Sequence, residues 1–95
     1  MTSANDPQTL RELPVGATAL IRRVGCARAT ARRLMEMGLL PGTRVEVRRV
    51  APLGDPIELR LRGYALCIRR AEAAAIEVDE IALPSLQAAL EESHA

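Results

Sequence analysis

The side chains that most often bind metals or form disulfides are few in this sequence and stand far apart. There are two cysteines, Cys26 and Cys67, neither in a C-x-x-C pair, and the one histidine is the penultimate residue, His94. A structural zinc site needs four such ligands at short, regular spacings. We therefore expect no metal site and no disulfide, and we predict two free thiols that are buried as small apolar side chains.

Groups that carry out catalysis are scarce as well. Acid–base and nucleophilic catalysis require several reactive side chains that converge on one point, whereas the only histidine, His94, stands near the terminus, where we expect a solvated side chain. The chain has no lysine and no glycine-rich loop followed by Lys-Ser or Lys-Thr, the pattern of the common phosphate-binding loop. We predict that the protein is not an enzyme, holds no cofactor and works by binding.

Charge is divided unevenly along the chain. All 13 basic residues are arginines between residues 11 and 70; five acidic residues share that segment, so its net charge is 13 − 5 = +8, whereas residues 71–95 carry six acidic residues and no base. This division fits a solvated arginine-rich exterior, a surface for an anionic partner, or a contact between the two parts. Nucleic acid is the main competing partner, but single-strand binders stack bases on several aromatic rings, and here Tyr64 is the only aromatic residue. We expect no nucleic acid.

Short elements have to position these side chains. Residues 1–9 are polar and contain a proline, so we expect a disordered leader. One turn of helix follows at residues 10–13, and residues 17–24 alternate like a strand. Residues 27–37 carry apolar side chains every three to four positions, which predicts a helix. After it, Gly38 is typical of a helix end, and Leu39 can make the hydrophobic contact that accompanies such an end.

The second half of the chain has the period of strands. Apolar and polar residues alternate over residues 43–50 and 57–62, with a break at Arg49-Val50 that a bulge or a sharp bend would explain. We place a two-residue hairpin turn at Gly63-Tyr64, because glycine suits the first position of one such turn. The register that follows pairs Leu61 with Leu66, Leu59 with Ile68, and Glu58 with Arg69.

Five short strands and one helix inserted after the first strand indicate an all-β fold, a small, curled antiparallel barrel. A helical turn at residues 70–75 and a strand at 76–78 complete it. We assign the barrel to residues 10–79 and a tail to residues 80–95, where Pro84 can begin a helix with Leu83, Leu86 and Leu90 on one side. No apolar run approaches about 18 residues, so we expect a cytoplasmic protein that reaches a membrane only through a partner.

Two motifs occupy the middle of the chain. The first is RLMEMGLLPG at residues 33–42, followed by VEV at residues 45–47. The second is APLGDPI at residues 51–57, followed by RGY at residues 62–64 and LCIR at residues 66–69. In order and spacing, the two motifs closely resemble the FeoA family of ferrous iron transport proteins.

The resemblance covers about residues 10–78 and implies an SH3-like barrel, in agreement with the strand pattern. It also implies an accessory protein of ferrous iron uptake. Such a protein acts by contact with FeoB, a membrane transporter that has a cytosolic GTP-hydrolysing domain, and is not itself an enzyme. A similar domain ends some iron-dependent repressors. The alternatives are a nucleic-acid-binding barrel and an iron-binding or metal-sensing protein.

A small binding module needs exposed apolar side chains rimmed by polar groups. Two stretches outside the strand alternation supply them, the helix exit and the proline-rich loop at residues 52–56. We predict that six residues there bind the partner: Met37, Leu39, Leu40, Pro41, Leu53 and Asp55. Two ordinary structural roles remain open, core packing for Leu39 and a hydrogen bond to its own turn for Asp55.

Overall fold

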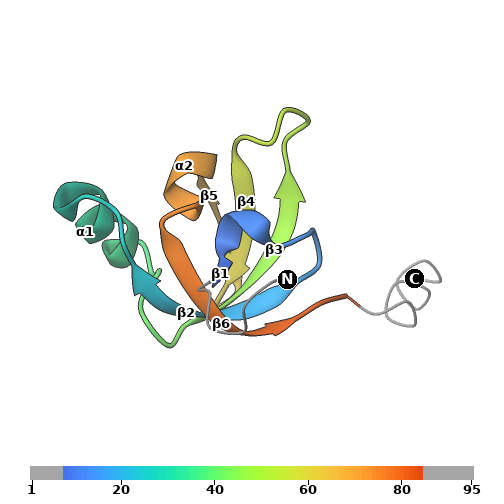
Figure 1. Cartoon of the computed structure of the whole chain (residues 1–95), viewed down its shortest axis with the longest axis horizontal. Helices are drawn as coiled ribbons and strands as arrows, with labels where there is room; N and C mark the ends of the chain where they lie inside the picture. The colour runs from blue at the N-terminus through green and yellow to red at the C-terminus, as the bar shows by residue number, and fades with distance from the viewer. Residues whose placement is uncertain (1–7, 85–95) are drawn as a thin grey trace, which may run out of the picture.

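A computed structural model describes residues 8–84 of the chain (Figure 1). Its elements are β1 (Gln8–Thr9), a 3₁₀ turn (Leu10–Glu12), β2 (Thr18–Val24), α1 (Arg28–Glu36), β3 (Arg44–Val50), β4 (Ile57–Leu61), β5 (Tyr64–Ile68), α2 (Arg70–Ala73) and β6 (Ile76–Ala82). The predicted strand at residues 17–24, the helix at 27–37 and the helical turn at 70–75 are confirmed. No helix in the described part is long and apolar enough to cross a membrane.

The strands form one antiparallel sheet in the order β1-β6-β2-β3-β4-β5. The sheet curls on itself with α1 at one side (Figure 1). Its edge strands, β1 and β5, do not pair with each other, so the sheet of residues 8–84 is not closed. The predicted all-β antiparallel architecture is confirmed, with six strands where we expected about five.

The limits of the domain differ slightly from the predicted ones. Gln8 and Thr9, which we assigned to the leader, form β1 and pair with Val78 and Glu77 of β6. β6 runs to Ala82, four residues beyond the strand that we expected. The predicted tail helix falls mainly on residues 85–95, which lie outside the described part of the chain.

The core lies on one face of the curled sheet. Val45 and Val47 of β3 and Leu59 of β4 are buried, while the residues between them point to the other face. Such alternation puts every second side chain into the core. Each fully buried valine or leucine contributes about 1.5–3 kcal/mol relative to an exposed one. Slipping one strand by a single residue would therefore expose its whole apolar set.

The end of α1 is fixed by hydrogen bonds around a glycine. The Leu39 N–H donates to the Leu34 carbonyl at 3.1 Å, and the Gly38 N–H donates to the Met35 carbonyl at 3.0 Å. Gly38 has φ +111°, a left-handed conformation that favours glycine. This is the Schellman ending, in which the residue after the glycine packs back onto the last turn of the helix. Leu39 and Leu34 accordingly both lie in the core.

The predicted β4–β5 register is wrong: the turn lies one residue earlier than predicted, so each β4 residue pairs with a β5 residue two positions before the predicted one. The two turn residues are Arg62 and Gly63, with φ of +50° and +87°. Positive φ at both positions is typical of a type I′ turn. The twist of this turn matches paired strands as well as that of the glycine-first turn that we expected, so twist alone could not distinguish the two. The observed pairs include Leu61 with Tyr64, Leu59 with Leu66, and Glu58 with Cys67. The shift is an even number of residues, which is why Leu59 and Ile68 still share the buried face.

Candidate protein-binding surfaces

One of the six predicted contact residues is excluded by its burial. Leu39 is 0 % exposed, because the helix ending turns its side chain into the core. The prediction that Leu39 contacts a partner is therefore wrong, and the alternative role, packing against the last turn of α1, is the observed one.

The other residues of the helix exit are accessible to different degrees. Leu40 is 41 % exposed, Pro41 is exposed, and Met37 is half-buried. The carbonyl of Met37 accepts a hydrogen bond from the Tyr64 hydroxyl, and the Tyr64 side chain is itself 43 % exposed. We name these four residues, Met37, Leu40, Pro41 and Tyr64, the exit patch. Its apolar area is small. The hydrogen bond between Tyr64 and Met37 holds β5 and the end of α1 together at this patch.

The loop between β3 and β4 carries the most exposed leucine. Leu53 is 92 % exposed. The loop is braced by two backbone hydrogen bonds, from the Gly54 N–H to the Ala51 carbonyl at 2.7 Å and from the Ala51 N–H to the Pro56 carbonyl at 3.0 Å. A braced loop presents a side chain with little ordering cost on binding. Leu53 is thus available as an isolated anchor.

Asp55 is exposed but has a structural partner. Its Oδ1 accepts a hydrogen bond at 2.9 Å from the backbone N–H of Arg70, the first residue of α2. The open alternative for Asp55 named its own turn, whereas the observed bond reaches an element 15 residues away. Asp55 therefore ties the β3–β4 loop to α2, and only its remaining acceptor sites are available to a partner.

The structure does not bring the predicted contact residues onto one surface. Met37, Leu40 and Pro41 of the exit patch precede β3 and the Leu53 loop follows it, so the seven residues of that strand separate them. An extended strand rises about 3.3 Å per residue, which places the two groups roughly 20 Å apart. Figure 1 shows the two loops at opposite ends of β3. They form two separate candidate contacts.

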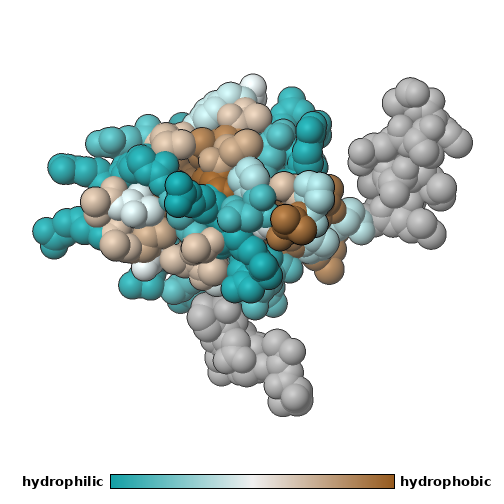
Figure 2. All heavy atoms as spheres, turned by 90° about the horizontal axis from the view of Figure 1, so that it is seen from above, coloured by the Kyte–Doolittle hydropathy of each residue, from teal (hydrophilic) through white to brown (hydrophobic). Residues whose placement is uncertain are grey.

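Four arginines of the sheet and one of α1 are engaged by carboxylates. Ion pairs join Arg22 to Asp79, Arg23 to Glu77, Arg33 to Glu72, Arg44 to Glu80, and Arg49 to Glu58. Exposed pairs of this kind contribute about 0–1 kcal/mol each. On the face seen in Figure 2, hydrophilic side chains predominate and hydrophobic ones show as small, separate groups. This supports the solvated-exterior reading for much of the basic segment.

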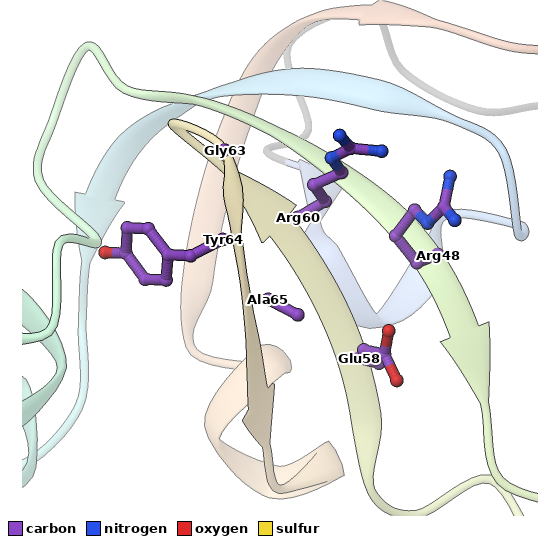
Figure 3. Close-up of a pocket in the computed structure, with 6 residues that line it drawn as sticks. All are labelled: Arg48, Glu58, Arg60, Gly63, Tyr64 and Ala65. Carbon is purple, nitrogen blue, oxygen red and sulfur yellow. The ribbon is translucent and has the colours of Figure 1, made fainter.

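Two arginines on the outer face of the sheet have no carboxylate within ion-pair distance among residues 8–84. Arg48 and Arg60 line a shallow hollow of about 240 Å³ together with Glu58 and Tyr64 (Figure 3). The β3–β4 register shifts between Val47 and Arg49, so Arg48 is the extra residue of the bulge that the sequence indicated. The bulge brings both guanidinium groups to one side of the sheet, where they can rim an interface.

The two thiols differ in environment. Both are free, as predicted, but Cys67 is exposed and only Cys26 is half-buried, so the expectation of two buried thiols is wrong for Cys67. The Cys26 Sγ lies 3.9 Å from the Glu72 carbonyl, to which it donates. Burial raises the pKa of the Cys26 thiol, and the nearby Glu72 carboxylate adds to the effect. A thiol with a raised pKa is a poor nucleophile and a poor metal ligand at neutral pH.

Within residues 8–84, no three His, Cys, Asp or Glu side chains lie close enough together to hold a metal ion. The described surfaces therefore offer apolar contacts, charges and an open strand edge. The contact between Tyr64 and Met37 was missed from the sequence, because it joins residues 27 positions apart in different elements. The one available signal was that Tyr64 is the sole aromatic side chain of the chain.

Comparisons with known proteins agree with these features. The profile of the FeoA domain family matches residues 8–80. A relative from Porphyromonas gingivalis, named as an Fe(2+) transport protein A/Fe(2+) transporter FeoB fusion protein, is 40 % identical over 72 residues. The match covers 76 % of this chain and 8 % of that protein. The chain thus corresponds to a small part of this curated relative.

Solved structures share both the fold and the sequence pattern. The solution structure of the FeoA protein from Chlorobium tepidum is 45 % identical, has a TM-score of 0.72, and aligns over 75 % of this chain and 68 % of its own. The crystal structure of FeoA from Stenotrophomonas maltophilia, described as an SH3 domain protein complexed with zinc, is 30 % identical with a TM-score of 0.71. It aligns over 82 % of this chain and 99 % of its own. The SH3-like fold is therefore confirmed.

Proposed function

The chain belongs to the FeoA family, and from this premise we propose that it serves ferrous iron uptake by binding the cytosolic part of an FeoB-like transporter. In this role it regulates the transporter by contact on the cytoplasmic side and performs no catalysis itself. It needs no cofactor and no nucleic acid for this role.

The observation that carries the proposal is the fused relative. In that Porphyromonas gingivalis protein, a region 40 % identical to this chain is joined to a transporter region in one polypeptide. Joining two modules raises their effective concentration to about the millimolar range, which favours a contact that is weak between separate chains. A contact between the corresponding parts is the simplest reason for such an arrangement.

The exit patch is the surface that we assign to this contact. Leu40 supplies an exposed apolar side chain, and Met37 and Pro41 flank it. Burying a leucine contributes about 1.5–3 kcal/mol, which corresponds to roughly tenfold to 150-fold in affinity. Leu53 and Asp55, at the other end of β3, form a second contact that a large partner can reach at the same time.

Calorimetric titration of the purified chain with the cytosolic part of an FeoB-like transporter tests the proposal. We expect saturable binding, at least tenfold weaker for Leu40→Glu and weaker to a smaller extent for Leu53→Glu. Arg60→Glu is the control for a change of charge, because Arg60 is exposed and has no ion pair within the described residues. It lines the hollow beside Tyr64 but adds no apolar contact, so we expect a much smaller loss of affinity than for Leu40→Glu. Circular dichroism checks that each variant folds.

Two results would contradict the proposal at different levels. If the wild-type chain does not bind, the assigned function is wrong. If it binds and both Leu40→Glu and Leu53→Glu bind equally well, the function stands but the contact lies on another surface.

A further inference from the structure

The two edges of the sheet are protected to very different degrees. β1 has two residues, whereas β5 has five, Tyr64–Ile68. β5 contains no charged residue, proline or glycine, and it pairs with β4 in a regular register without a bulge. Natural edge strands usually carry one of these features, because an open edge recruits other strands. The unprotected edge of β5 is therefore a candidate site for pairing with a strand of a partner.

The register identifies which backbone groups of β5 are available. Tyr64 directly follows the two-residue turn and pairs with Leu61, and in such hairpins these two residues exchange both backbone hydrogen bonds. Pairing alternates along an antiparallel ladder, so Ala65 and Cys67 direct their N–H and C=O groups away from β4. Outside the ladder, no backbone hydrogen bond among residues 8–84 involves either residue. Both residues are exposed.

A groove lies between α1 and the Cys67 end of this edge. It is a hollow of about 460 Å³ lined by Thr30 and Arg33 of α1, by Cys67 and Ile68 of β5, and by Pro56, Arg69 and Glu72. At the other end Tyr64 reaches across to Met37 at the end of α1. Figure 3 shows Tyr64 and Ala65 on opposite sides of β5, with Tyr64 extending away from the sheet. The exit patch therefore lies at the other end of the same strand edge.

The arginines beside the groove favour an occupant with acidic side chains. Of the arginines that line the hollow, Arg33 is ion-paired with Glu72, whereas Arg69 has no carboxylate within ion-pair distance among residues 8–84. α1 adds two exposed arginines, Arg28 and Arg32, that also have no ion pair in that range, and one glutamate, Glu36. A second copy of this chain paired through β5 would bring two such basic walls together, and like charges at an interface are costly. An extended segment with acidic side chains complements both the open backbone groups and the arginines.

We propose that an extended, acid-bearing segment of the partner adds to the sheet as a strand beside β5, in the groove against α1. This rests on the proposed function, since the partner is the cytosolic part of the FeoB-like transporter. The bound segment pairs with the backbone of Ala65 and Cys67, and its carboxylates face Arg69 and the arginines of α1. Strand addition then supplies the main-chain contacts that the small exit patch lacks.

Cys67→Pro tests the backbone pairing. The substitution removes an N–H that β4 does not use, which is the arrangement in which proline is tolerated on an edge strand. The control is Cys67→Thr, which retains the N–H and suits a strand. In titrations with the transporter's cytosolic part, we expect Cys67→Pro to bind at least tenfold more weakly than wild type and Cys67→Thr to bind within about twofold. Arg69→Gln should also weaken binding, whereas Arg22→Gln, on β2, which β3 and β4 separate from β5, should not.

Amide hydrogen exchange on the wild-type chain gives a second readout that does not depend on any variant's folding. We expect the Ala65 and Cys67 amides to become protected at least tenfold when the partner is added, with no such change at Thr9 on the opposite edge. Wild-type binding without this protection would overturn strand addition and leave the proposed function intact. Protection that rises with protein concentration in the absence of partner would overturn it in favour of self-pairing. No wild-type binding would overturn both.

Discussion

Gly38 joins three features of the molecule at a single residue. Its φ of +111° ends α1, its position brings Leu39 into the core, and a Cβ there would collide with the Tyr64 hydroxyl. Gly42 shares the positive φ, at +89°, but a Cβ on it would meet no heavy atom within 4 Å. Comparing alanine substitutions at Gly38 and Gly42 therefore separates the cost of backbone strain from the cost of the clash with Tyr64.

Gly38→Ala should lower the free energy of unfolding more than Gly42→Ala. An alanine held in the left-handed region costs about 1–2 kcal/mol, and Gly42→Ala should cost only this amount. Gly38→Ala must also displace Tyr64, so we expect a further loss. Urea unfolding of both variants measures the difference. In a Tyr64→Ala background the two substitutions should cost the same; an unchanged difference would show that another contact is responsible.

Cys26 should make the stability of the protein depend on alkaline pH. Its folded-state pKa is raised, so the folded chain favours the neutral thiol more than the unfolded chain does. The resulting stabilisation is complete below the unfolded-state pKa of about 8.5 and is lost as the pH rises through the folded-state value. We expect Cys26→Ala to show a smaller fall in melting temperature between about pH 8 and pH 10 than wild type. Cys67→Ala is the control, and it should keep the wild-type profile.

The β4–β5 turn shows how an element can be recognised while its position is misjudged. Glycine in a two-residue turn fits either the first or the second central position, and the neighbours decide which. Here the turn places Arg62 at φ +50°, an uncommon conformation for a residue other than glycine or asparagine. The pairing of β4 with β5 holds Arg62 in this conformation in spite of its energetic cost. A residue that adopts positive φ more readily would lower that cost.

Arg62→Asn should therefore stabilise the protein. Asparagine adopts positive φ more readily than arginine, and turn optimisation of this kind typically adds about 0.5–2 kcal/mol to the free energy of unfolding. Thermal and urea unfolding measure the gain. Arg60→Asn is the matched control two residues earlier, within β4, where asparagine is unfavourable, so it should lower stability. A loss of stability in Arg62→Asn would show that its side chain makes a contact that outweighs the strain.

Local signals predicted most elements, whereas long-range pairing decided the rest. The end of α1 was predictable because Gly38 and Leu39 follow the helix directly. The irregularity in β3 was predictable because the alternation breaks at Arg49, next to the bulged residue Arg48. The open edge of β5 was not predictable, since the order of strands depends on contacts between distant segments. For the same reason, the sequence grouped Leu40 with Leu53, although β3 holds them at opposite ends.

The distribution of charge over the whole molecule bears on which class of partner it binds. The described residues include all 13 arginines, and five of these form ion pairs with carboxylates of the same chain. Such self-neutralised arginines attract phosphates less strongly than a continuous basic stripe would. Two arginines without a carboxylate partner among residues 8–84, Arg48 and Arg60, share their hollow with Glu58 and with one aromatic ring, Tyr64, rather than with a series of rings on which bases could stack.

Salt dependence should distinguish a protein partner from a nucleic acid. A nucleic-acid binder that makes 6–10 phosphate contacts loses about 10³–10⁵ in affinity between 50 and 200 mM salt. We expect binding to the transporter's cytosolic part to fall less than about tenfold over this range, because apolar and backbone contacts are not screened. Arg48→Gln combined with Arg60→Gln should slow association and flatten the salt dependence while leaving dissociation nearly unchanged, since rim charges act mainly on the encounter. Surface plasmon resonance at both salt concentrations, with a DNA duplex as the comparison ligand, measures all of these quantities. Tight binding to the duplex that collapses at 200 mM salt would instead assign the arginines to phosphate recognition.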